Sequence, residues 1–161
     1  MPKPSPKLQH LIEMKLQRER ERTPLYPDKY RVSPKYEVTT ANGLTKAIID
    51  LIDLVGGWAT RISTEGRTIT TKRVTHGVFG ATSAMEAKRI PSSTKLGTAD
   101  IHAVVAGRHL SIEVKVGRDR QSERQLEVEE RIRQAGGIYI IARDFDSVYD
   151  QVMALTQQRS A

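Results

Sequence analysis

The sequence predicts an α/β protein in which a mixed β-sheet carries helices on its faces. Four segments place apolar residues at helical spacing, and the shorter apolar or alternating runs between them are typical of strands. The helical segments are 5–22, 41–55, 121–134 and 144–157, and the strand-like segments are 58–63, 68–74, 100–106, 109–115 and 138–142. This order indicates one sheet packed against helices.

The composition suits one soluble globular domain. A chain of 161 residues, 38% hydrophobic and 28% charged, is long enough to bury a core. The absence of cysteine excludes disulfides and cysteine-based zinc sites or nucleophiles, and the four histidines lack the spacing of zinc ligands. No apolar run approaches the roughly 18 residues that a membrane span needs, and the charged N-terminus is unlike a signal peptide, so we expect a cytoplasmic protein.

The net charge of +7 is unevenly distributed along the chain. Residues 1–40 carry nine Lys/Arg against five Asp/Glu, residues 58–99 carry seven against two, and the other segments are slightly acidic. A one-sided positive excess favours a polyanionic partner, of which nucleic acid is the first candidate. Charge alone leaves a generically basic protein as an equally good interpretation.

The first 40 residues are predicted to be a basic N-terminal helical arm and linker, ahead of a domain at 41–157 and a polar tail at 158–161. Ser5, followed by proline, can cap a helix that runs to about Arg22. Because the second half of this helix is wholly polar, it has little to bury by itself. Three interpretations stay open: packing on a partner subunit, contact with nucleic acid, and a solvated arm, which is favoured.

The segments before the centre of the chain are predicted with less regular structure. Residues 23–36 are rich in proline and tyrosine and predict an extended linker, whose tyrosines either pin it to the core or stack on bases. Residues 58–63 and 68–74 predict a strand pair that turns at Glu65-Gly66. Residues 75–98 predict a long irregular loop, and loops of that length tend to be functional or disordered.

The centre of the chain predicts a β-hairpin that turns at Gly107-Arg108. The expected pairs on its apolar face are Ile101 with Val114, Ala103 with Ile112 and Val105 with Leu110; those on the polar face are Asp100 with Lys115, His102 with Glu113 and Val104 with Ser111. A slip of one residue would mix the two faces, so the pattern itself favours this register.

Three ionisable side chains meet on the polar face of this hairpin. Glu113 and Lys115 are two residues apart on one strand and therefore point the same way, and Asp100 lies across from them. Two carboxylates at this spacing can share one hard cation with an amine beside it. As a bare pair, Asp100 and Lys115 would more often form an ordinary cross-strand ion pair, worth under about 1 kcal/mol when exposed.

An aspartate that opens one strand, with Glu-x-Lys on the next, resembles the PD-(D/E)xK nuclease superfamily, and within it the VRR-NUC branch, which is related to Holliday-junction resolvases. The matching residues are 97–100, 112–115, Ser122, Gln125 and 136–139. The likeness covers about residues 42–148. It implies a restriction-endonuclease-like fold with an α-β-β-β-α-β core.

The resemblance also implies a metal site and roles around it. Asp100, Glu113 and the backbone carbonyl of Val114 would bind Mg²⁺, for which Mn²⁺ can substitute. Lys115 would hold or deprotonate the attacking water, and Gln125 would orient Lys115 or the water.

One position departs from the family. The glutamate that the family carries near the start of its first helix falls at Asn42, whose amide oxygen can bind a cation or its water without adding charge. Glu37 is the alternative if the helix begins earlier. Two functions therefore stay open: a metal-dependent nuclease acting on DNA, with branched or phage-replication structures among its substrates, and a catalytically weakened nucleic-acid-binding protein on the same fold.

Basic residues outside the metal site are expected to contact the nucleic-acid backbone, namely Arg61, Lys88, Arg89, Lys95, Arg118 and Arg120. Arg118 and Arg120 are equally well explained as solvated charges. Because junction resolvases of this superfamily typically work as dimers, the resemblance also implies a homodimer, in a bacterial or phage-infected cell.

Overall fold

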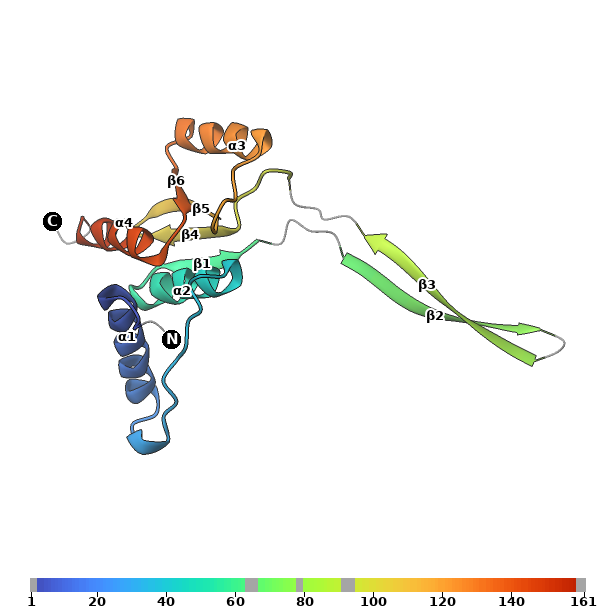
Figure 1. Cartoon of the computed structure of the whole chain (residues 1–161), viewed down its shortest axis with the longest axis horizontal. Coiled ribbons are helices and arrows are strands. Elements are labelled where there is room, and N and C mark those ends of the chain that lie inside the picture. The colour runs from blue at the N-terminus through green and yellow to red at the C-terminus, as the bar shows by residue number, and fades with distance from the viewer. Residues whose placement is uncertain (1–2, 63–66, 78–79, 91–94, 159–161) are drawn as a thin grey trace. The chain divides into compact units, whose positions relative to one another are not determined.

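The computed structural model describes residues 3–62, 67–77, 80–90 and 95–158 (Figure 1). The chain divides into two compact units, one made of residues 1–62 with 97–161 and the other of residues 63–96. The first unit holds a four-stranded sheet with helices, and the second holds a two-stranded hairpin. The predicted class, a mixed β-sheet flanked by helices, is confirmed.

The sheet of the first unit has the strand order β1-β4-β5-β6. Strands β1 (Trp58–Arg61), β4 (Ile101–Val105) and β5 (Arg108–Val114) pair antiparallel, whereas β6 (Ile138–Ala142) runs parallel to β5. A parallel neighbour requires a crossover connection, which helix α3 (Glu123–Gln134) provides. Within this unit the chain order is α1 (Pro6–Arg22), the 3₁₀ helix η1 (Asp28–Tyr30), α2 (Ala41–Leu54), β1, β4, β5, α3, β6 and α4 (Phe145–Gln157).

One face of this sheet is apolar and forms the core with helices α2 (Ala41–Leu54) and α4 (Phe145–Gln157). The strands contribute Ile101, Ala103, Val105, Leu110, Ile112 and Ile140, and the helices contribute Leu44, Ile48, Leu51, Ile52, Val148 and Val152, all buried. The alternate side chains of β5, such as Glu113, point to the opposite face, where α3 lies. Helix α3 buries none of its own side chains and reaches the sheet through polar groups.

The N-terminal helix α1 (Pro6–Arg22) is part of this core at its first half. The Ser5 hydroxyl accepts a hydrogen bond from the Leu8 N–H at 3.2 Å, which is the predicted cap. Leu8 and Leu11 are buried in the same apolar cluster as the sheet. The expectation of a solvated arm is therefore wrong for this part of the helix, because two leucines one turn apart are enough to dock it.

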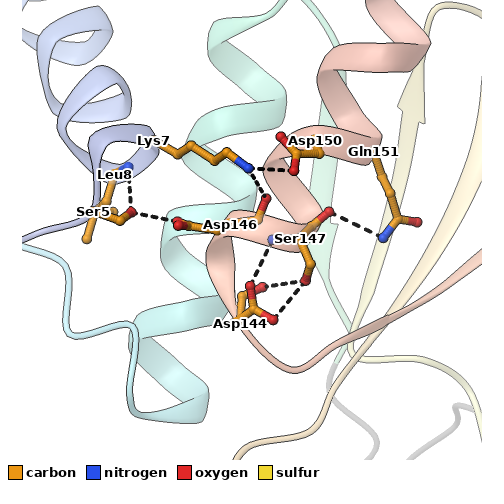
Figure 2. Close-up of polar contacts among 8 residues, drawn as sticks. All are labelled: Ser5, Lys7, Leu8, Asp144, Asp146, Ser147, Asp150 and Gln151. Carbon is orange, nitrogen blue, oxygen red and sulfur yellow. Dashed lines mark hydrogen bonds and ion pairs between the residues drawn. The ribbon is translucent and has the colours of Figure 1, made fainter.

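Polar contacts join the start of α1 to the start of α4 (Figure 2). The Ser5 hydroxyl donates a 2.6 Å hydrogen bond to Asp146, and the Lys7 amine lies 2.5 Å from a carboxylate oxygen of Asp150. Asp144 caps the start of α4 by accepting from the Ser147 N–H at 2.8 Å. The two helix starts thus hold each other in place.

The predicted linker is attached to helix α2 by one of its tyrosines. The Tyr36 hydroxyl donates a 2.7 Å hydrogen bond to Asp50, and burial with this carboxylate raises the pKa of Tyr36 well above its usual range. Lys15 of α1 pairs with the same carboxylate at 2.6 Å. This tyrosine therefore has the pinning role, while Tyr26 and Tyr30 are exposed.

Two predictions about the strands before the centre are wrong. β1 pairs with β4, and β2 (Arg67–Gly77) pairs with β3 (Gly80–Ile90), so residues 58–63 and 68–74 do not form a strand pair. The predicted irregular loop is strand over residues 75–77 and 80–90. The predicted turn at Glu65-Gly66 lies outside the described residues.

The central hairpin turns at Ala106-Gly107, one residue earlier than predicted. The φ angles of 50° at Ala106 and 78° at Gly107 are typical of a two-residue type I′ turn. The observed pairs are Ile101 with Ile112, His102 with Ser111, Ala103 with Leu110, Val104 with His109 and Val105 with Arg108. This register differs from the predicted one by two residues, so each face keeps its members and every partner changes.

Candidate active site

The observed register brings the predicted acidic residues closer together than the sequence suggested. One step beyond the last pair of β4 and β5, Asp100 lies opposite Glu113, and not opposite Lys115. The Val114 N–H donates a 3.0 Å hydrogen bond to Oδ2 of Asp100, which fixes this carboxylate against the end of β5. His102 lies opposite Ser111, so its predicted place beside Glu113 is also wrong.

Glu113 is a carboxylate in the interior of the protein, with only 2% of its surface exposed. Its Oε1 atom accepts from the Lys115 amine at 3.1 Å and from the Gln125 amide at 2.5 Å. Its Oε2 atom is buried and has no hydrogen-bond partner among the described residues. Burial, and then the negative charge of Asp100, raise the pKa of Glu113 against the opposing effect of Lys115.

Lys115 continues β5 past its last residue and is also buried, at 7% exposed. Its backbone N–H donates to the Ala142 carbonyl at 2.9 Å, which extends the pairing with β6. Burial lowers the pKa of Lys115, but the hydrogen bond to Glu113 and the charges of Glu113 and Asp119 outweigh it, and the net pKa is raised. The side chain is thus an ammonium ion that donates hydrogen bonds, which favours the holding role over the role of a base.

Gln125 is placed at Glu113 by the first turn of α3. The Ser122 hydroxyl accepts from the Gln125 N–H at 3.3 Å, and the Gln125 side-chain oxygen accepts from the Ser122 N–H at 2.9 Å, forming a reciprocal capping box. The remaining amide group of Gln125 donates to Glu113. The oxygen and the nitrogen of the Gln125 amide are therefore both held, and the amide orients the Glu113 carboxylate. The sequence had predicted that Gln125 orients Lys115 or a water.

Polar side chains continue along the same face of the sheet, two residues before Glu113 on β5. His102, Ser111 and Tyr139 lie in a row across β4, β5 and β6. The Nε2, Oγ and Oη atoms of these residues are buried without hydrogen-bond partners among the described residues, as is Oε2 of Glu113. Such atoms usually bind ordered water, an ion or a ligand. His102 also contacts the exposed His109 at 3.3 Å between ring nitrogens.

The residues at this site fit a hard divalent cation in part. The unpartnered Oε2 of Glu113 is a free carboxylate oxygen beside Asp100, and Mg²⁺ is commonly held by one or two carboxylates while it keeps several waters. Over the described ranges, no group of three or more His, Asp and Glu side chains is arranged to hold a metal. Any cation here would therefore depend on two carboxylates, backbone oxygen and water.

The two candidates for a further metal ligand, Asn42 and Glu37, are not linked to the site by a described contact. Asn42 lies in the first turn of α2 and is exposed, and Thr40 caps that helix, so the helix does not begin early enough to include Glu37. Glu37 is exposed, and its backbone carbonyl accepts from the Thr40 N–H at 3.0 Å.

The predicted nucleic-acid-binding residues fall in both units. Arg61 ends β1, and Arg118 and Arg120 follow β5, all in the first unit and all exposed. Lys88, Arg89 and Lys95 belong to the second unit and are exposed there.

Two residues near the site make contacts that the sequence did not predict. Asp119 lies 3.4 Å from the Lys115 amine, four residues along the chain, and Arg143 donates to the Asp119 backbone carbonyl at 3.3 Å. The acid-base spacing of Lys115 and Asp119 was a weak signal for the first contact. The capping box of α3 had a stronger signal in the sequence, because Ser122 and Gln125 form the pattern Ser-x-x-Gln that is typical of such a box at the start of a helix.

Comparison with known proteins does not add to this description: no protein-family model matches the chain, and no curated protein matches it. In the part of the chain that the structure describes, no helix is both long and apolar enough to cross a membrane.

Proposed function

We propose that this protein is a metal-dependent nuclease that hydrolyses phosphodiester bonds in DNA, with branched or phage-replication structures among its substrates. The observation that carries the proposal is the buried, unpartnered Oε2 of Glu113, next to Asp100 and in a carboxylate that Lys115 and Gln125 hold. A protein that leaves a carboxylate oxygen buried without a partner pays in stability, which is typical of functional sites.

The cofactor of the proposed enzyme is Mg²⁺, or Mn²⁺ in its place. Asp100, Glu113 and the backbone carbonyl of Val114 would hold it. A cation bound there would lower the pKa of a bound water and offset the negative charge that develops on the phosphate.

The protein's own groups supply the rest of the mechanism. The Lys115 ammonium donates hydrogen bonds to the attacking water or to a phosphate oxygen, and stabilises negative charge there. Gln125 keeps Glu113 in one orientation. Arg118 and Arg120, exposed just after β5, contact the DNA backbone.

The same proposal includes the finer fold and family assignments. The element order α2-β1-β4-β5-α3-β6 and the aspartate ahead of a Glu-x-Lys strand support a restriction-endonuclease-like fold of the PD-(D/E)xK superfamily, close to its VRR-NUC branch. A homodimer in the cytoplasm of a bacterial or phage-infected cell belongs to this proposal as well.

A cleavage assay with Mg²⁺ or Mn²⁺ tests the chemistry on duplex, single-stranded, flap and four-way DNA. Asp100→Asn, Glu113→Gln and Lys115→Met should each lower the cleavage rate at least about 100-fold. Glu130→Gln is the matched control, because Glu130 is an exposed carboxylate on α3. Cleavage that survives in both Glu113→Gln and Lys115→Met would refute the proposed nuclease assignment.

One observation favours a second function, a catalytically weakened nucleic-acid-binding protein on the same fold. The family's first-helix glutamate is replaced by Asn42, and within the described ranges no third His, Asp or Glu is arranged with Asp100 and Glu113 to hold a metal. Tight DNA binding without cleavage in either metal, at any of the four substrates, would favour this function.

A further inference from the structure

The second unit holds a long β-ribbon, and in its described residues, 67–77, 80–90 and 95–96, no other helix or strand covers this ribbon. Strands β2 and β3 pair without interruption from Arg67 with Ile90 to Gly77 with Gly80, 11 residues in each strand, and the two strands twist around each other in Figure 1. Every described side chain in 68–74 and 83–89 is exposed, apart from the half-buried Ile69. Isolated two-stranded hairpins are marginally stable in water, so this ribbon fits a role in contact with a partner.

The charge of this unit identifies the class of partner. Residues 63–96 carry six Lys/Arg and two Asp/Glu, so 34 residues hold a charge of +4 out of the net +7 of the chain. Phosphate backbones dominate the affinity of nucleic acids for such surfaces. This excess of positive charge favours a polyanion as the partner of the ribbon.

The register separates the described side chains into two faces. The Lys72 face consists of Thr68, Thr70, Lys72, Val74, Ser83, Met85, Ala87 and Arg89; the Arg73 face consists of Ile69, Thr71, Arg73, Ala84, Glu86 and Lys88. Each face has two cations, but the one acid among them, Glu86, is on the Arg73 face. The Lys72 face also exposes 72% of Met85 and 49% of Val74, apolar groups suited to contact with base edges and thymine methyls.

The dimensions of the ribbon match the major groove of B-form DNA. Paired strands lie about 4.8 Å apart, so two strands with their side chains fill a groove about 12 Å wide. Eleven residues at about 3.3 Å each span about 36 Å. The groove winds around the helix axis, so its path over one turn is longer than the axial repeat of about 34 Å, and a ribbon of this length follows it for less than one turn. The right-handed twist of a two-stranded ribbon allows it to follow the groove.

We propose that the β2–β3 ribbon inserts into the major groove of duplex DNA over less than one turn, with the Lys72 face toward the bases. Lys72 and Arg89 contact the bases and nearby phosphates, while Arg73 and Lys88 point away from the groove floor. This inference rests on the proposed function for its choice of DNA as the partner, and it does not depend on whether the protein cleaves the DNA. It assigns the ribbon the binding role and adds Lys72, Met85 and Val74 to the residues that the sequence had predicted.

Binding measured by fluorescence anisotropy in EDTA tests the ribbon separately from cleavage. The full-length chain is compared with two matched variants, Lys72→Thr/Arg89→Thr on one face and Arg73→Thr/Lys88→Thr on the other. Threonine keeps the strand propensity of this Thr-rich ribbon. Lys3→Gln/Lys35→Gln removes two exposed charges from the first unit and serves as the control.

The expected result is a Kd for a duplex of about 20 base pairs that rises at least 10-fold in the Lys72-face variant, with a salt slope smaller by about 2. The Arg73-face variant and the control should change the Kd less than about 3-fold. Equal losses from the two faces, or no loss beyond the control, would overturn the inference and leave the nuclease proposal standing. If the wild-type chain binds no DNA, the proposed function fails as well.

Double-stranded RNA of the same sequence provides a second measurement. The major groove of A-form RNA is too deep and narrow for side chains to read, so the wild-type chain should bind the RNA duplex at least 10-fold more weakly. Methyl green, which occupies the major groove, should displace the protein from DNA, and netropsin, a minor-groove ligand, should not. Equal affinity for both duplexes, or displacement by netropsin alone, would contradict insertion in the major groove.

Discussion

The Gln125 amide donates a 2.5 Å hydrogen bond to Glu113 while its side-chain oxygen closes the capping box of α3. One residue therefore both starts a helix and orients a buried carboxylate. Because α3 buries none of its side chains, this contact is among the few that tie the helix to the sheet.

Substitution of Gln125 separates the two roles. Gln125→Ala removes the cap partner and the bond to Glu113, so we expect about 1 kcal/mol of lost stability and a fall in kcat of about 10-fold with little change in KM. Ser122→Ala breaks the other half of the capping box and leaves the amide able to reach Glu113. It should cost similar stability, measured by urea unfolding, and retain most of the kcat. Equal loss of kcat in both variants would show that Gln125 acts only through the helix.

The raised pKa of Glu113 predicts a pH dependence of stability. The folded state binds this proton more tightly than the unfolded chain, so the contribution of Glu113 to stability falls as pH rises above its ordinary pKa of 4.5. In Glu113→Gln this loss is absent. The unfolding free energy of the variant relative to wild type should therefore increase from about pH 4.5 to pH 7, as measured by urea unfolding across that range. Lys115 stays protonated over this range, so the loss of its carboxylate partner changes the unfolding free energy by the same amount at each pH. A difference between variant and wild type that stays flat or falls with pH would contradict the raised pKa of Glu113.

Metal binding should stabilise the folded chain independently of catalysis. At a free Mg²⁺ or Mn²⁺ concentration about 100 times Kd, linkage adds about 2.7 kcal/mol and a corresponding rise in Tm. Asp100→Asn/Glu113→Gln should abolish the rise, because both carboxylates are lost. Glu130→Gln should keep it. A rise that is equal in all three proteins would place the cation elsewhere.

The packing of α1 predicts a large effect from one leucine. Leu11 is fully buried, so Leu11→Ala should lower the unfolding free energy by about 2–5 kcal/mol, as in other buried Leu to Ala substitutions. Leu25→Ala is the control, because Leu25 is 96% exposed and should change stability by less than about 0.5 kcal/mol. If the two substitutions cost the same, α1 is not docked on the core.

The turn of the central hairpin predicts a stabilising substitution. Ala106 has a φ of 50°, and asparagine followed by glycine is the preferred pair in a type I′ turn. Ala106→Asn should therefore raise the unfolding free energy by about 0.5–1 kcal/mol, and Gly107→Ala should lower it by a similar amount. Thermal unfolding followed by circular dichroism measures both, and a loss of stability in Ala106→Asn would argue for the turn at Gly107-Arg108.

The sequence was sufficient to predict which residues share a face of the hairpin, but it did not predict the register. Side chains alternate with a period of two, so a slip of two residues keeps Ile101 and Ile112 on the apolar face and leaves the pattern unchanged. The turn chemistry decides between the alternatives, and alanine at a positive φ gave no signal for it. Asp100, Glu113 and Lys115 were still predicted together, because that prediction needs only the shared face.

The long ribbon could not be predicted for a different reason. All described side chains of β3, residues 83–89, are exposed, so this segment has no alternation of buried and exposed positions. The Thr-rich, basic strand β2 pairs with β3, and not with the strand that precedes it in the chain. The capping box and the contact of Lys115 with Asp119 depend on how α3 and its preceding loop cross the sheet, which periodicity does not encode.

Strands β1 and β4 are antiparallel neighbours, and Arg61, at the end of β1, pairs with Ile101, at the start of β4. The chain thus leaves the sheet and re-enters it at facing positions, as it would around an ordinary short turn. The residues between these points form a module whose length and sequence can change without any shift in the pairing of the four-stranded sheet. If the ribbon carries a target preference, as proposed, that preference can change while Asp100, Glu113 and Lys115 keep their positions in the sheet.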